Sequence, residues 1–151
     1  MFIVSAKLTK RNVLLSVLIL GLLIVLVTGL LSRNSSPSEP IPGDTDQQRI
    51  AYLSSLGWVT SVTPSETLEF TLPDPLGETY ERYNQLQKEQ GFDLSAYAGR
   101  QVKRFTYQVV NHPSAPEGTQ ADLYVCDGIV IGGDILCTGP DSFVATLEFP
   151  Q

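Results

Sequence analysis

Histidine and cysteine are scarce in this chain of 151 residues, which contains one histidine, His112, and two cysteines, Cys126 and Cys137. A structural zinc site usually takes four Cys or His ligands, more than the chain possesses. A Ser-His or Cys-His nucleophilic system would have to use His112, and no G-x-S-x-G motif accompanies it. We therefore predict no catalytic residue, no metal and no cofactor, and treat His112 as an ordinary loop residue.

Positive charge is also sparse, with ten Lys and Arg against sixteen Asp and Glu. All sixteen acidic residues follow residue 31 together with seven cations, so this part carries a net charge of −9, against −6 for the whole chain. Lys103 and Arg104, interleaved with Phe105 and Tyr107, are typical of a nucleic-acid-binding strand. Two adjacent cations in so acidic a region do not provide the required attraction, and we predict no nucleic-acid partner.

One long hydrophobic run is present, and it extends from Val13 to Leu31 without a charge. As a helix this run would be roughly 28 Å long, close to the hydrocarbon thickness of a bilayer. Lys7, Lys10 and Arg11 precede it, whereas only Arg33 follows closely. The excess of positive charge before the run predicts a single-pass anchor in the cell membrane, with a cytoplasmic N-terminus and an extracytoplasmic C-terminal part.

The alternative to an anchor is a cleaved secretory signal. Its apolar region is usually about 7 to 15 residues long, and no A-x-A pattern follows the run here. The small residues at 27–29 keep cleavage open. With an uncleaved anchor, the chain divides into a cytoplasmic tail (1–12), a transmembrane helix (13–31), a flexible linker rich in Ser, Pro and acidic residues (32–45) and an extracytoplasmic domain (46–151).

Two helices are expected in the domain. The first covers residues 46–56, because Thr45 and Gln48 have the spacing of a capping box. The second extends from Asp74, as its N-cap, through Pro75 in the first turn to about Gln90. Each is followed by a glycine and an aromatic residue, which is typical of a helix end.

Alternating apolar residues indicate strands over residues 58–62, 67–72, 101–111, 121–126, 129–135 and 143–149. Asp127-Gly128 predicts a two-residue type I′ hairpin turn, and Gly132-Gly133 a bulge or bend in the strand that follows. The resulting prediction is an α+β domain, an antiparallel meander of three to five strands with two helices covering one face.

Several blocks of the domain resemble the bacterial domain-of-unknown-function family numbered 4830. They are IAYLSSLGW at 50–58, YNQLQKEQGFDLS at 83–95, YAG at 97–99 with VKRFTYQV at 102–109, and DGIVIGGD at 127–134. The resemblance implies a small domain associated with the envelope of Gram-positive bacteria, behind an N-terminal membrane segment. It implies no activity and supplies no catalytic residues.

Acidic residues offer one candidate site. Asp122, Asp127 and Asp134 lie on or beside one predicted hairpin, where two converging carboxylates could support glycoside hydrolysis or bind calcium. Their spacing does not match an EF-hand loop. The alternative interpretation assigns Asp127 to the turn and Asp134 to a strand end, and it is the one we favour. Gly128, Gly132 and Gly133 resemble a phosphate loop only superficially, because no helix begins after them.

The remaining candidates are aromatic residues and thiols. Tyr80, Tyr83, Phe92 and Tyr97 could line a groove for a peptide or glycan, but such stripes usually form core. Cys126 and Cys137 would be roughly 26 Å apart along an extended strand, so two separate, partly buried thiols are favoured over a disulfide.

A functional expectation follows from these patterns. We expect a membrane-anchored, non-enzymatic interaction or sensory module of the cell envelope, with the bilayer as one partner and an envelope protein, peptide or glycan as another. The alternatives are an envelope hydrolase that uses a carboxylate cluster and a structural spacer.

Overall fold

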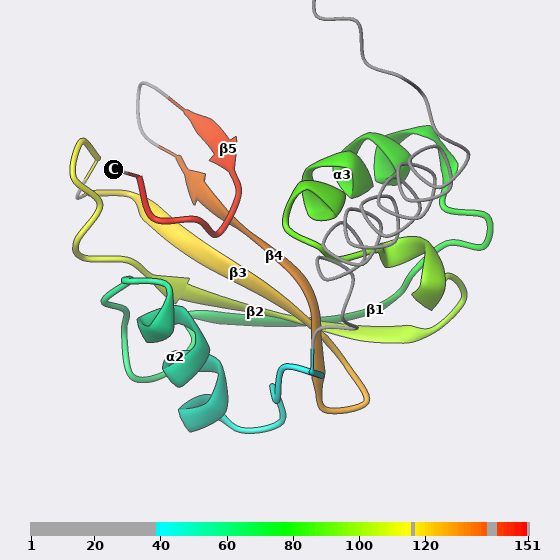
Figure 1. Ribbon diagram of the computed structural model, residues 1–151, viewed down its shortest axis with the longest axis horizontal. Helices are drawn as coiled ribbons and strands as arrows, with labels where there is room; N and C mark the ends of the chain where they lie inside the picture. The colour runs from blue at the N-terminus through cyan, green and yellow to red at the C-terminus, as the bar shows by residue number, and fades with distance from the viewer. Residues whose placement is uncertain (1–38, 116, 139–141, 151) are drawn as a thin grey trace, which may run out of the picture. The chain divides into compact units, whose positions relative to one another are not determined.

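The computed structural model describes residues 39–115, 117–138 and 142–150 as one α+β unit (Figure 1). Five antiparallel strands follow one another in chain order across a single sheet, as the meander prediction requires. The elements are α2 (Asp46–Ser55), β1 (Glu66–Thr71), α3 (Gly77–Glu89), a 3-10 turn η2 (Leu94–Tyr97), β2 (Gln101–Gln108), β3 (Thr119–Cys126), β4 (Ile129–Cys137) and β5 (Phe143–Ala145).

The predicted tail and membrane span lie outside the described residues, as does the first half of the predicted linker, residues 32–38. Across the described part of the chain, from residue 39 onward with its short gaps, no helix has both the length and the apolar character that a bilayer crossing demands.

Helix α2 forms as its sequence predicts. The Thr45 hydroxyl accepts from the Gln48 N–H at 3.3 Å, and the Gln48 side chain accepts from the Thr45 N–H at 3.0 Å. At the other end Gly57 has φ +100°, and the N–H of Trp58 donates to the Leu53 carbonyl. The capping box and the glycine therefore set the two ends of α2.

Substituting Thr45 by alanine is expected to lower the free energy of unfolding by about 1 kcal/mol, because the Gln48 N–H loses its acceptor at an exposed helix end. Urea denaturation measures this change. The Thr45→Ser variant keeps the hydroxyl and should remain near wild type, and an equal loss in both variants would contradict the cap.

Three segments differ from their predictions. The last strand, β5, ends at Ala145 and not at residue 149, and the Leu147 N–H bonds to the Gln90 side chain instead of a strand. Residues 58–62 form only an isolated bridge between Thr60 and Val109 instead of a strand, because the Val59 N–H bonds to the Asn111 side chain and not to a strand carbonyl. Helix α3 begins at Gly77, after a cis Asp74–Pro75 peptide, and Leu76 occupies the N-cap without a side-chain hydrogen bond. The assignments of Asp74 as the cap and Pro75 to the first turn are therefore wrong.

The two helices pack on opposite faces of the sheet, so the prediction that both cover one face is wrong (Figure 1). Leu53 of α2 belongs to a core cluster with Leu123 and Val125 of β3. Tyr83 of α3 packs against a second cluster that contains Cys126, with Tyr124 beside it. Successive residues of a strand point to opposite faces, so β3 contributes to two separate cores.

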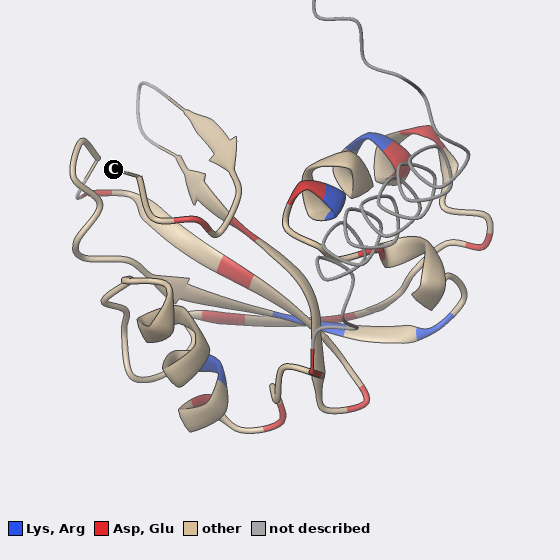
Figure 2. Cartoon of the chain, viewed as in Figure 1, with Lys and Arg blue, Asp and Glu red and all other residues tan. Residues whose placement is uncertain are grey.

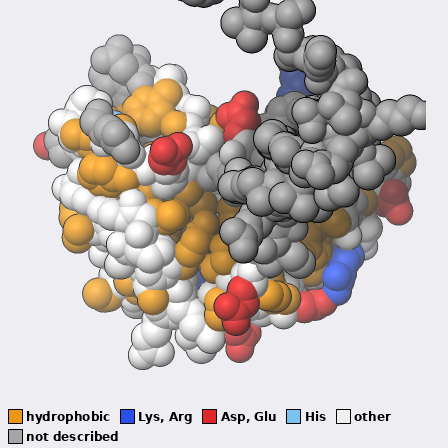
Figure 3. All heavy atoms as spheres, viewed as in Figure 1, with side chains coloured by type: hydrophobic (Ala, Val, Ile, Leu, Met, Phe, Trp, Pro, Cys, Tyr) orange, Lys and Arg blue, Asp and Glu red, His pale blue; other side chains and the backbone are white. Residues whose placement is uncertain are grey.

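Figure 2 shows charged residues on helices, strands and turns, and Figure 3 shows apolar side chains in several places on the face that it draws, with acidic side chains among them. Carboxylates occur on strands as well as turns, and two of them, on β3 and β4, are buried. Five large apolar side chains are exposed, namely Val59, Val62, Leu68, Val110 and Val144. Scattered apolar residues of this kind are normal on a soluble domain and do not mark a docking face by themselves.

Candidate functional site

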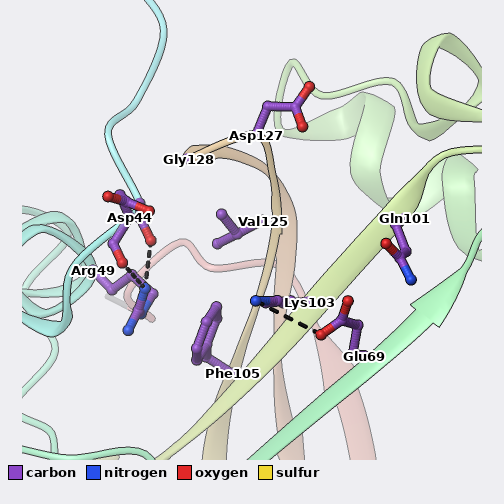
Figure 4. Close-up of a pocket in the computed structure, with 10 residues that line it drawn as sticks. Asp44, Arg49, Glu69, Gln101, Lys103, Phe105, Val125, Asp127 and Gly128 are labelled. Atoms are coloured by element: carbon purple, nitrogen blue, oxygen red, sulfur yellow. Dashed lines mark hydrogen bonds and ion pairs between the residues drawn. The ribbon is translucent and has the colours of Figure 1, made fainter.

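A pocket of about 420 Å³ opens on the α2 face of the sheet, beside the β3–β4 turn (Figure 4). Phe105 of β2 and Val125 of β3 give it an apolar part, and Arg49 comes from α2. The other lining residues are Gly43, Asp44, Glu69, Gln101, Lys103, Asp127 and Gly128. The pocket therefore combines an apolar surface with ionisable groups of both signs.

Arg49 fastens the segment that precedes α2 to the pocket wall. Its side chain is 4% exposed and donates to the carbonyls of Gly43 and Asp44, to the Asp46 carboxylate and to the Tyr107 hydroxyl. The guanidinium carbon lies 3.6 Å from the Phe105 ring centroid, a cation–π contact. Because its donors are used within the protein, Arg49 positions the wall and leaves ligand contacts to other residues.

The same segment is also bound to the hairpin. Pro42 forms a bridge with Ile129, the Gly43 N–H donates to the Gly128 carbonyl, and the Val130 N–H donates to the Ile41 carbonyl. Residues 41–44, which composition assigns to the linker, therefore form an ordered edge of the pocket.

Two of the carboxylates that line the pocket, those of Glu69 and Asp127, are held in surface ion pairs. The Lys103 ammonium lies 3.6 Å from the Glu69 carboxylate, and both side chains are about half exposed. Asp127 pairs with Arg100. Exposed pairs of this kind contribute only about 0–1 kcal/mol, so a charged ligand can replace either partner at little cost.

A second candidate site consists of Asp122 and Asp134, which oppose each other directly on β3 and β4 and are each 4% exposed. Asp122 accepts from the Thr106 hydroxyl, and Asp134 accepts from the Tyr83 hydroxyl of α3. Asp134 lies inside β4, so the assignment of this residue to a strand end is wrong. The structure therefore brings together two of the three predicted carboxylates and leaves Asp127 at the turn.

A β-bulge explains why these two carboxylates share a face. The pairing of Cys126 with Ile129 and of Val125 with Val130 changes at Tyr124, which pairs with Gly132. In the unshifted register Asp134 would pair with Ala121 and point to the other face. One extra residue thus brings Asp134 opposite Asp122.

Burial perturbs the acid–base properties of this cluster. Burial raises the pKa of Asp134 to about 6 and also raises the pKa of Asp122. It is the largest cause of both shifts. The hydrogen bonds from Tyr83 and Thr106 act in the opposite direction. Burial also raises the pKa of Tyr124, which lies beside the pair, to about 12. Such shifts at a charge cluster mark a candidate functional site.

Gln87 is the polar residue at this site that the sequence does not reveal. Its side chain is fully buried and binds both backbone groups of Gly133 in β4, donating to the carbonyl at 3.0 Å and accepting from the N–H at 2.8 Å. A Cβ at Gly132 would lie 2.7 Å from the Gln87 side-chain oxygen, and one at Gly133 would lie 2.6 Å from the Asp122 carbonyl. The two glycines therefore permit close packing, and the phosphate-loop interpretation has no support.

His112 and the cysteines have structural surroundings. The His112 ring is buried, stacks on Trp58 at a centroid distance of 5.9 Å, and accepts through Nδ1 from the N–H groups of Ser114 and Ala115. Cys126 and Cys137 are both buried free thiols, at opposite ends of the β3–β4 ladder. The prediction of two separate thiols is confirmed, with greater burial than expected.

The aromatic candidates do not form a single groove. Tyr80, Tyr83 and Tyr97 pack against the α3-side core, whereas Phe92 packs against the α2-side core. Lys103 and Arg104 point to opposite faces of β2 and bind Glu69 and Glu66. Within residues 39–138 and 142–150, apart from residue 116, no three His, Cys, Asp or Glu side chains are grouped so that they could hold a metal.

Comparison with known proteins connects this geometry to one family. Searches among curated proteins and among solved structures found no match. The model of the domain of unknown function DUF4830 matches residues 52–135, from within α2 to within β4. This match spans more than half of the chain and confirms the resemblance seen in its sequence blocks, and the protein accordingly belongs to the DUF4830 family.

Proposed function

We propose that this protein is a single-pass membrane protein whose acidic C-terminal domain lies outside the cytoplasm and serves as a binding and sensory module of the cell envelope. The uncharged run at residues 13–31 and the cations before it support the anchor and its orientation. The net charge of −9 after residue 31 favours a domain that stays in water beside the membrane and does not bind the lipid surface.

The observation that carries the proposal is the position of the pocket next to the chain segment that leads to the predicted span. Gly43 and Asp44 line the pocket, and the predicted span ends at Leu31. At most about 3.6 Å of chain per residue puts the pocket within roughly 40 Å of the bilayer. A ligand that contacts Gly43 or Asp44 would thus bind where the linker joins the domain.

The chemistry of the pocket favours a short peptide that carries both an amino and a carboxylate group. Lys103 can pair with the carboxylate, and Glu69 and Asp44 can pair with the amino group, since all three line the same opening. Phe105 and Val125 offer contact for an apolar side chain between the two charges. The surface pairs that such a ligand would replace are weak.

Photo-crosslinking in membranes tests the binding proposal. A photoreactive residue at Gln101, on the pocket rim, should give a discrete peptide adduct that is lost when Lys103→Glu reverses the charge. The matched control is the same photoreactive residue at Glu89, an exposed position on the last turn of α3 outside the pocket. Identical adducts from both positions, or an adduct indifferent to Lys103→Glu, would refute a specific pocket ligand.

Topology needs its own measurement. A C-terminal alkaline phosphatase fusion should be active, and a C-terminal green fluorescent protein fusion dark, if the domain is exported. The reverse pattern would refute the orientation, and a shortened, released chain would identify residues 13–31 as a cleaved signal.

The hydrolase alternative has one favourable observation, the three carboxylates Asp44, Glu69 and Asp127 in the pocket. Two of them are ion-paired, with Lys103 and Arg100. The other two predicted acids, Asp122 and Asp134, are 4% exposed, so a substrate could not reach them without rearrangement. Binding is therefore the better-supported function.

A further inference from the structure

The buried pair of Asp122 and Asp134 contains more negative charge than its surroundings neutralise. Directly opposed side chains of an antiparallel pair have Cβ atoms about 4.5–5.5 Å apart, and like charges at that distance repel. Burial strengthens the repulsion because little water screens it.

The only cation facing the pair among the described residues is Arg104 of β2. Its Nε lies 3.8 Å from the Asp122 carboxylate, is buried and has no hydrogen-bond partner within the described chain. The same guanidinium binds Glu66 of β1 through another nitrogen. The Arg104 guanidinium is therefore shared between the carboxylates of Asp122 and Glu66, and Asp134 is a third carboxylate beside the same positive charge.

Asp134 receives no cation and depends on neutral groups. The Tyr83 hydroxyl of α3 donates to it, and the Tyr83 ring lies 5.7 Å from the Tyr124 ring of β3. Thr106 of β2 donates to Asp122 only. The titratable and charged groups around the pair are thus Arg104, Glu66, Tyr83 and Tyr124, and three carboxylates face one positive charge.

We propose that Asp122 and Asp134 form a pH-sensitive lock between the sheet and helix α3. When one proton is bound, Asp134 is a neutral acid beside Tyr83, and Asp122 remains a carboxylate facing Arg104. When that proton leaves, the two opposed buried carboxylates repel each other, and this repulsion acts on β4 next to Gly133, the partner of Gln87 on α3. The hydrogen bond from Tyr83 favours the charged form of Asp134 and offsets only part of the repulsion.

The direction of the pH dependence follows from the raised pKa of Asp134, about 6 in the folded protein against 3.8 for an ordinary Asp, with burial as the main cause. The folded state keeps a proton that the unfolded chain releases, so the proton on Asp134 stabilises the folded state fully below about pH 4. This stabilisation is lost as the pH rises through about 6 and is absent above that value.

The test uses the full chain in detergent micelles, with urea denaturation between pH 4 and pH 7.5. The unfolding equilibrium constant should increase about 100-fold over this range in the wild type through the titration of Asp134. Asp134→Asn should remove most of that increase. The matched control, Asp127→Asn, changes an exposed carboxylate at the turn and should keep the wild-type profile; an unchanged profile in Asp134→Asn would overturn the proposal.

Two measurements on the wild type keep the test decisive if Asp134→Asn does not fold. The carboxyl carbon of Asp134 should titrate with a midpoint near pH 6 in NMR spectra, and a midpoint near 4 would overturn the proposal. Hydrogen exchange of α3 amides, corrected for its intrinsic pH dependence, should be slower at pH 5 than at pH 7.5. Equal protection at both pH values would overturn the link to α3.

Discussion

Replacing Gln87 by leucine should lower the free energy of unfolding by about 1–3 kcal/mol, although leucine has a similar size and a greater affinity for the core. The Gln87 amide supplies partners to the N–H and the carbonyl of Gly133. The ladder between β4 and β5 begins at Ile135, so no strand replaces those bonds at Gly133. Each buried backbone group left without a partner costs about 1–3 kcal/mol.

Urea denaturation at constant pH measures the loss. Gly133 keeps one bond in the variant, because Gln90 also donates to its carbonyl at 3.1 Å. The control is Gln85→Leu, an exposed position on the same helix, which should change stability by less than about 0.5 kcal/mol. Similar losses in the two variants would show that the effect comes from helix composition and not from the bonds to Gly133.

Trp58→Ala should have the largest effect of any single substitution considered, about 3–5 kcal/mol of unfolding free energy. The Trp58 side chain is 1% exposed, and its Nε1–H donates to the Leu147 carbonyl at 2.7 Å. Its ring contacts Phe149 at a centroid distance of 4.7 Å. The substitution therefore leaves a large cavity and releases the segment that follows β5.

Thermal unfolding combined with limited proteolysis measures both consequences, the lower melting temperature and earlier cleavage after β5. Val59→Ala is the matched control, because the adjacent side chain is 54% exposed and should contribute little. Trp58→Phe keeps an aromatic ring but removes the donor, and should lie between alanine and wild type. Resistance of Trp58→Ala to proteolysis at the C-terminal segment would contradict the packing role.

Local features of the domain could be predicted because their causes lie within a few residues. The capping box requires only Thr45 and Gln48, and the type I′ turn requires only Asp127 and Gly128, whose φ values are +49° and +75°. The predicted start of α3 is wrong because its cause does not lie within a few residues of the chain. The path of the chain through Asp74 and Pro75 depends on the Leu72 and Leu76 side chains, which are buried in the α3-side core.

Neither candidate site could be predicted completely. The pocket needs residues 43–44, strand β2 and the hairpin turn to meet, and composition alone assigns residues 43–44 to a flexible linker. Gln87 is a polar residue on a predicted helix, and nothing near it in the sequence indicates that Gly133 is its partner. Such contacts join residues far apart in the chain, and no local pattern encodes them.

The sequence alone determined helix α2, the β3–β4 hairpin, the antiparallel order of the strands and the family, because alternation, caps and turn residues act over short distances. Only the tertiary structure decided the two faces of the sheet. Tyr124 and Cys126 can be buried as readily as Leu123 and Val125, so the pattern of β3 does not reveal which helix packs on which side. The bulge at Tyr124 and Val125 likewise decided that Asp122 meets Asp134, because a one-residue shift in register moves a side chain to the opposite face.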